Sequence, residues 1–212
     1  MKKRKADGPK RPMPPSRLFE NMLEGALYIP APEVRAWIEA TFLDDRSPLF
    51  NIEHIHIRQA HYAILWTNEL NVKQGRRVAG TAENVIFRCS AWQRGRQEQQ
   101  MREWFGAVPE LLITLDANYA AQASDSEFCA LVEHELYHCG QACDEFGAPA
   151  FTKDGLPKFT LRGHDVEEFV GVVRRYGPTE DVQRVIDAAK GAPEVAKINI
   201  ARACGTCLLK VA

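Results

Sequence analysis

Hydrophobic residues in the first third of the chain fall into short runs with helical or alternating spacing. Helical spacing, with a proline suited to the first turn, predicts a helix over Pro32–Leu43, and a shorter helix is expected over Arg17–Leu27. The alternation of isoleucine and histidine over Asn51–Ile57 predicts a strand. Ile55 and Ile57 would share one face of that strand, and His54 and His56 would be exposed on the other.

The middle of the chain combines apolar extended segments with one polar helix. His61–Trp66 predicts a buried extended segment, and a turn at Gly75 leads into a further extended run over Val78–Phe87, as in a hairpin. Gln93–Trp104 is polar with helical spacing and few breakers. Glu110–Leu115 is a short apolar segment typical of a strand.

The strongest helix signal follows this strand. Ser124 with Glu127 three residues later matches a capping box, and no glycine or proline interrupts the pattern before Gly140. The sequence therefore predicts a long, well-capped helix that contributes to the core.

The last part of the chain mixes loop and helix. Five Gly and Pro residues make 144–163 loop-like, apart from an extended patch near its end. Helices are expected from His164 or Asp165 to Tyr176 and over Thr179–Lys190, with a final helix and strand-like tail in Ala192–Ala212. No internal repeat is apparent. Helices, a few strands and further helices in this order predict an α+β fold with a small mixed sheet.

Charge divides the chain into a tail and a body. Hydrophobic residues make up 45% and charged residues 26%, which is typical of a globular protein. The net charge of -1 hides a basic, Pro-rich start with seven Lys or Arg and one Asp in residues 1–17. We expect a disordered tail over 1–16 and a single domain over 17–212. The tail is either a solubilising leader or a contact for nucleic acid.

The sequence predicts neither a membrane protein nor a secreted one. No apolar stretch is long enough to span a bilayer, and prolines replace the apolar region of a secretory signal. The six cysteines are therefore expected to be reduced. Cys204 and Cys207 form a CxxC, which Cys139 and Cys143 could complete as a zinc site, although structural or incidental cysteines are favoured. A cytoplasmic location is expected.

The predicted capped helix contains the motif His134-Glu135-Leu-Tyr-His138, an HExxH sequence. Spacing of four residues puts both imidazoles on one helical face, where they can bind one metal ion. Zinc lowers the pKa of a bound water, and Glu135 can accept its proton as it attacks a carbonyl and pass the proton to the leaving amine. The motif predicts Zn²⁺ as cofactor and Glu135 as general base.

A catalytic zinc ion takes three protein ligands and a water molecule. His164 is the histidine that follows the motif, and a helix beginning there could direct it to the metal. Glu167 or Glu168 on the same predicted helix is an alternative third ligand, and an upstream histidine is another. His134, His138 and His164 are the favoured set.

These motifs carry a resemblance to known families. The strand Glu110–Leu115, the HExxH helix and the segment Gly-His164-Asp-Val-Glu-Glu-Phe169 resemble zincin metallopeptidases, in particular the phage metallopeptidase family, and are similar to SprT-like proteases. Phe169 comes one position later than in the SprT pattern, and the loop before His164 is longer. The resemblance covers about residues 50–176. It implies a zincin-like domain in a bacterial or phage-infected cell, with Leu111–Leu115 as the edge strand that pairs with substrate.

The resulting functional prediction is a zinc metallopeptidase acting on protein or peptide substrates. Hydrolysis also needs a hydrogen-bond donor for the developing oxyanion, and we expect Tyr176 in this role, with Tyr137 and Arg174 or Arg175 as alternatives. Two other functions stay open. One is a zinc-binding interaction module without proteolysis, and the other is a SprT-like DNA-associated protease anchored by the basic tail.

Overall fold

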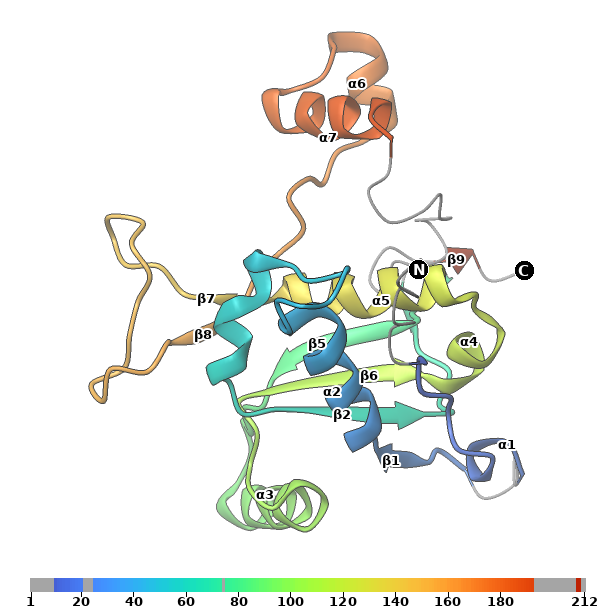
Figure 1. Cartoon of the computed structure of the whole chain (residues 1–212), viewed down its shortest axis with the longest axis vertical. Coiled ribbons are helices and arrows are strands. Elements are labelled where there is room, and N and C mark those ends of the chain that lie inside the picture. Colours follow the sequence, from blue (N-terminus) through green and yellow to red (C-terminus); the bar gives the residue numbers. More distant parts are fainter. Residues whose placement is uncertain (1–9, 21–24, 74, 193–208, 211–212) are drawn as a thin grey trace, which may run out of the picture.

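The computed structural model describes residues 10–20, 25–73, 75–192 and 209–210. Its centre is a four-stranded sheet in the order β1-β2-β6-β5 (Figure 1). These strands are β1 (Tyr28–Pro30), β2 (Tyr62–Thr67), β6 (Leu111–Asp116) and β5 (Gly80–Asn84). β2 and β6 are parallel, whereas β1 and β5 run antiparallel to their neighbours. The expected α+β fold with a small mixed sheet is confirmed.

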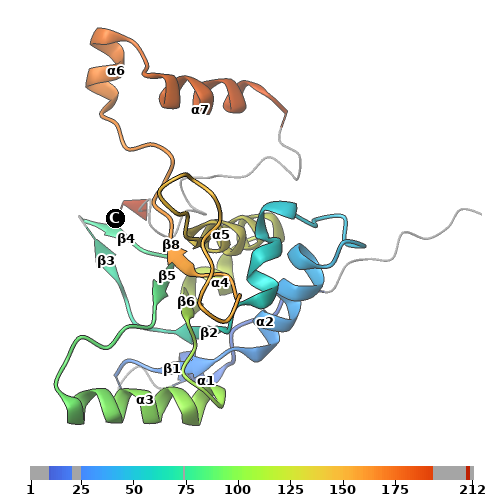
Figure 2. The same cartoon turned by 90° about the vertical axis from the view of Figure 1, so that its left-hand side faces the viewer.

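Helices cover the two faces of this sheet unequally. One face packs against α2 (Pro32–Ile38), its continuation η1 (Glu39–Leu43), and α5 (Asp125–His138), and it forms the main core around Trp66 and Phe128. The other face carries a small apolar cluster under the C-terminal end of α3 (Ala91–Phe105). Figure 2 shows α3 and α5 on opposite sides of the sheet.

Further elements surround this framework. They are α1 (Arg17–Glu20), η2 (Ile52–Gln59), β3 (Val72–Lys73), β4 (Arg76–Arg77), α4 (Ala117–Gln122), β7 (Cys139–Gln141), β8 (Phe159–Leu161), α6 (Val170–Tyr176), α7 (Glu180–Lys190) and β9 (Leu209–Lys210). β7 and β8 pair as an antiparallel hairpin. β3, β4 and β9 form a three-stranded sheet in which β4 lies in the middle. Apart from β9, the segment predicted as a final helix and tail lies outside the described residues. No described helix is long and apolar enough to cross a membrane.

The predicted strand over Asn51–Ile57 is wrong, because this segment forms the 3₁₀ helix η2. Its buried positions are His54, Ile57 and Ala60, which recur every three residues as a 3₁₀ helix requires. His54 is therefore 1% exposed, whereas the strand prediction placed it on the exposed face.

Two other expectations need correction. β6 is not an edge strand, because β2 and β5 flank it, and the edge strands of this sheet are β1 and β5. The helix expected to begin at His164 begins at Val170, so His164 lies in a non-helical segment between β8 and α6.

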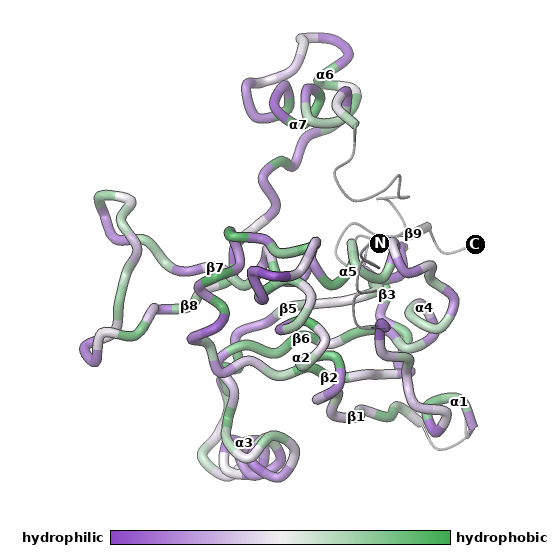
Figure 3. The backbone as a smooth tube through the Cα atoms, in the orientation of Figure 1, coloured by the Kyte–Doolittle hydropathy of each residue, from purple (hydrophilic) through white to green (hydrophobic). Residues whose placement is uncertain are grey.

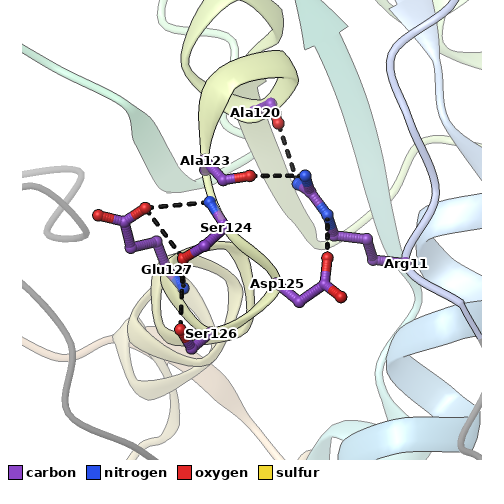
Figure 4. Close-up of polar contacts among 7 residues, drawn as sticks. All are labelled: Arg11, Ala120, Ala123, Ser124, Asp125, Ser126 and Glu127. Atoms are coloured by element: carbon purple, nitrogen blue, oxygen red, sulfur yellow. Dashed lines mark hydrogen bonds and ion pairs between the residues drawn. The ribbon is translucent and has the colours of Figure 1, made fainter.

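The described end of the N-terminal segment contacts the domain through Arg11. Its guanidinium donates to the carbonyl oxygens of Ala120 and Ala123 at the end of α4, at 2.9 and 2.6 Å (Figure 4). It also pairs with Asp125 at 2.7 Å and lies over the ring of Phe128. One basic residue of the tail is thus occupied by the start of α5.

Candidate metal centre

Helix α5 is defined by its cap and its buried face. The Ser124 hydroxyl accepts from the amide of Glu127, and the Glu127 carboxylate accepts from the amide of Ser124, so the predicted capping box is present. Phe128, Leu131, Val132 and Leu136 are buried at helical spacing. This packing fixes the rotation of α5 and leaves the two motif histidines half-buried at the side of the core.

The structure brings His134, His138 and His164 together. The Nε2 atom of His134 lies 3.1 Å from Nε2 of His138 and 3.2 Å from Nε2 of His164. One ligand atom from each residue falls within 4.8 Å of the others. They open onto a cavity of about 180 Å³, which is lined by His134, Tyr137, His138, Arg162, Gly163, His164 and Asp165.

The hairpin β7–β8 orients His138. Its Nδ1 lies 2.7 Å from the Arg162 carbonyl oxygen, and the Arg162 amide donates to the His138 carbonyl oxygen at 2.9 Å. A ring that donates from Nδ1 presents Nε2 as a lone pair, which is the form that binds a metal. The same pair of bonds places the chain that leads to His164 beside the end of α5.

The donor set fits a zinc ion. Burial, together with the neighbouring His138 and His164, lowers the pKa of His134 to about 4, since a second positive charge there would be repelled. Burial and His138 also lower the pKa of His164. Three imidazoles that converge on one point are a donor set that suits zinc, which takes three protein ligands and keeps a fourth position open in catalytic sites.

Glu135 lies beneath these histidines at the interface between α5 and β5. Its side chain is 0% exposed, and burial raises the pKa of its carboxyl group to about 8. Neither carboxylate oxygen forms a well-aligned hydrogen bond with the described residues, although the backbone N–H of Ala82 favours the ionised form. A buried carboxyl group with so little compensation is costly for stability and is typical of a functional residue.

Gly80 on β5 gives Glu135 its room. A Cβ atom at Gly80 would lie 2.9 Å from Oε1 and 3.2 Å from Cγ of Glu135. The strand and the carboxyl group can therefore be in contact only because this position has no side chain.

Other candidates lie elsewhere. Tyr176 is 76% exposed on α6, which Figures 1 and 2 show well apart from α5, and it does not line the cavity. Glu167 and Glu168 are not part of the described three-histidine group. Of the upstream histidines, His56 bonds the Cys139 carbonyl oxygen and His61 faces that of Val108.

Tyr137, the alternative to Tyr176, lines the cavity. Its hydroxyl donates to Glu53 at 2.6 Å and accepts from Asn51 at 3.0 Å. Burial, together with Glu53, raises the pKa of this phenol to about 12. The spacing of three residues from His134 places Tyr137 on the same side of the helix, and that signal was available in the sequence.

The cysteines do not extend this site. Cys139 is buried in the main core and Cys143 is exposed, and both are free thiols. Cys204 and Cys207 lie outside the described residues, so the CxxC stays a sequence observation.

Comparison with known proteins places the chain in a family. No curated protein and no solved structure shows a significant match. A family model described as "Putative phage metallopeptidase" matches residues 35–190, a range that contains strands β2, β5 and β6 of the central sheet, the motif helix and all three clustered histidines. A peptidase of this kind uses a metal ion and acts on protein or peptide. Because the match covers most of the sequence, the chain belongs to the phage metallopeptidase family.

Proposed function

We propose that this protein is a zinc-dependent metallopeptidase with His134, His138 and His164 as ligands. The observation that carries the proposal is the position of His164. It is 30 residues from His134 in sequence, on a separate segment, and its Nε2 lies 3.2 Å from Nε2 of His134. Such convergence supports a metal site more strongly than the motif does, since two histidines on one helix arise easily by chance.

Zinc bound to these ligands would supply Lewis acidity toward water and toward a peptide carbonyl. Glu135 accepts a proton from the attacking water at its carboxylate and delivers it to the leaving nitrogen. A pKa raised toward neutrality by burial suits a group that must both accept and release a proton. The Arg162 carbonyl keeps the His138 ring in its metal-binding tautomer.

The edge strand β5 is the proposed site of substrate pairing. It runs beside α5, and Gly80 contacts Glu135. An extended peptide added to a sheet edge gains main-chain hydrogen bonds while its side chains alternate between the two faces. Substrate held there would lie next to the general base.

The mechanism also needs a hydrogen-bond donor for the oxyanion. Tyr176, which the sequence favours, is exposed on α6 away from the cavity. Tyr137 lines the cavity, so we propose it as the donor, with its hydroxyl group turning from Glu53 to the substrate.

The test combines metal content with activity. Elemental analysis of the wild type should give one zinc ion per chain, lost in His134→Ala and in His164→Ala. Glu135→Gln should keep the zinc and lose peptide hydrolysis. If the wild type contains no zinc after reconstitution, the proposal is wrong. Zinc retained in His164→Ala would point to Glu167 or Glu168. A biological activity that survives Glu135→Gln would indicate a zinc-binding interaction module.

A further inference from the structure

The chain makes a long excursion between the second and third histidines. Residues 142–158, here named the arm, connect β7 to β8 and project away from the domain (Figures 1 and 2). His138 directly precedes β7, and two residues separate His164 from the end of β8. The base of the arm is therefore fixed to the candidate metal centre.

The fold itself does not require the arm. Gln141 and Phe159 are direct partners in the antiparallel ladder of β7 and β8. A two-residue turn is enough to join antiparallel strands at such a pair. Connections as long as the arm are uncommon in compact domains and are mostly functional.

The arm is ordered by its own backbone. The Ala142 amide donates to the Lys158 carbonyl, the Lys158 amide to the Ala150 carbonyl, and the Ala150 amide to the Ala142 carbonyl, at 2.8, 3.0 and 2.7 Å. These bonds form a closed ring of three segments spaced eight residues apart. The arm is thus a built element with a defined surface.

The ring reflects an internal repeat that inspection of the sequence missed. Gly147-Ala-Pro-Ala-Phe151 and Gly155-Leu-Pro-Lys-Phe159 share the pattern Gly-x-Pro-x-Phe. Gly147 and Gly155 have φ of +79° and +78°, which non-glycine residues rarely adopt. Each repeat thus closes one tight turn.

The arm exposes large apolar side chains. Phe146 is 85%, Phe151 58% and Leu156 55% exposed. Figure 3 shows hydrophobic segments along the arm between hydrophilic ones. Apolar side chains displayed on an ordered projection mark a binding surface, because burying them against a partner releases water that nothing in the domain displaces.

Charge narrows the class of partner. The arm carries two lysines, Lys153 and Lys158, against three carboxylates, Asp144, Glu145 and Asp154. This balance gives no attraction for a polyanion, so nucleic acid is disfavoured. The three apolar side chains lie at separate positions along the arm, namely in its first turn, in a β-bridge and after its second turn. A flexible polypeptide can contact them one after another, whereas a rigid surface would need a matching shape.

We propose that the arm binds apolar segments of unfolded or loosely folded protein substrates and holds them next to the metal centre. This inference rests on the proposed function, since it names the substrate class of the same site. A segment bound to the arm has its flanking chain within reach of the cavity, because the two ends of the arm lead directly to His138 and His164.

Binding can be measured without cleavage. The full chain carrying Glu135→Gln and loaded with zinc is titrated against fluorescently labelled, reduced and carboxymethylated α-lactalbumin, followed by anisotropy. Replacing residues 142–158 with Asn-Gly in this background should weaken binding at least about tenfold. Changing Phe146, Phe151 and Leu156 together to serine should do the same with the backbone of the arm intact. Zinc content reports that each variant is folded.

A matched control removes exposed apolar residues elsewhere. Ile86→Ser with Trp92→Ser changes side chains that are 61% and 89% exposed outside the arm and should leave binding unchanged. Equal binding with and without the arm overturns the proposal. So does a wild-type dimer that the arm deletion converts to monomer, since the partner is then a second copy. If binding depends on the arm but the wild type hydrolyses no peptide, the proposed binding role of the arm is supported and the proposed peptidase activity is contradicted.

Discussion

Gly80 and Glu135 are in such close contact that a methyl group on the glycine would lie 2.9 Å from a carboxylate oxygen. Gly80 begins the edge strand β5, and Glu135 is a fully buried charged residue of the motif helix. The strand where substrate is proposed to pair and the proposed general base are therefore fixed relative to each other without any intervening side chain.

Gly80→Ala should displace the Glu135 carboxyl group and lower kcat by at least about tenfold, because a small displacement of a catalytic group strongly reduces the reaction rate. Zinc content should not change, since no ligand touches the new methyl group. Gly95→Ala on α3 is the matched control, because a Cβ there meets nothing within 4 Å. Equal loss of activity in both variants would show that the contact has no catalytic role.

The buried carboxyl group predicts how the stability of the metal-free protein varies with pH. Glu135 has a raised pKa of about 8, so the folded state holds a proton that the unfolded state has released, and stability falls as pH rises toward 8. The lowered pKa values of His134 and His164 have the opposite effect, because they make stability rise with pH until about pH 6.5. The net decrease should therefore appear between pH 6.5 and 8.

Urea unfolding in the presence of a chelator measures this dependence. The wild type should lose about 2 kcal/mol of unfolding free energy across that interval, and Glu135→Gln should lose far less. A wild-type curve that is flat or rising above pH 6.5 would show that the carboxyl group is ionised in the folded state without penalty.

Metal binding should stabilise the fold, because the three histidines come from two segments that are separated in the unfolded chain. Zinc at a free concentration about a hundredfold above its Kd is expected to add about 3 kcal/mol of unfolding free energy. Thermal melts with zinc and with chelator test this. His164→Ala should melt like the chelated wild type in both conditions, whereas His61→Ala, outside the cluster, should keep the zinc response.

Tyr137→Phe should lower kcat more than Tyr176→Phe does. The first variant removes a hydroxyl from the cavity wall, and the second removes an exposed hydroxyl on α6. A loss of about tenfold or more in kcat, with KM and zinc content little changed, is expected for an oxyanion donor. The reverse order of the two variants would restore Tyr176.

Arg11→Ala should destabilise the protein by about 2 kcal/mol, because two carbonyl groups at the end of α4 lose a charged donor. The ion pair with Asp125 contributes little to this value, since that carboxylate is 88% exposed. Chemical denaturation checks the change, with Lys10→Ala as a control at an exposed neighbouring position. A similarly small change in the free energy of unfolding for Arg11→Ala and Lys10→Ala would show that the Arg11 contacts do not stabilise the protein.

The sequence by itself predicted the elements whose signals are local. The capping box, the uninterrupted apolar face and the HExxH spacing predicted α5 and its two histidines, since all three depend on residues within one or two turns. The apolar runs His61–Trp66 and Glu110–Leu115 likewise predicted the strands β2 and β6. Local spacing failed at Asn51–Ile57, where alternation predicts a strand, but burial of His54 and Ile57 against the core favours a 3₁₀ helix.

The tertiary structure decided which distant residues meet. Only the hairpin β7–β8 places His164 beside α5, and only the strand order makes β5 the edge that contacts Glu135. For the same reason the sequence cannot exclude Tyr176, because the position of α6 relative to the cavity has no local signal. A residue's neighbours in sequence set its backbone conformation, whereas pairing between strands and packing between layers set the chemistry that its side chain encounters.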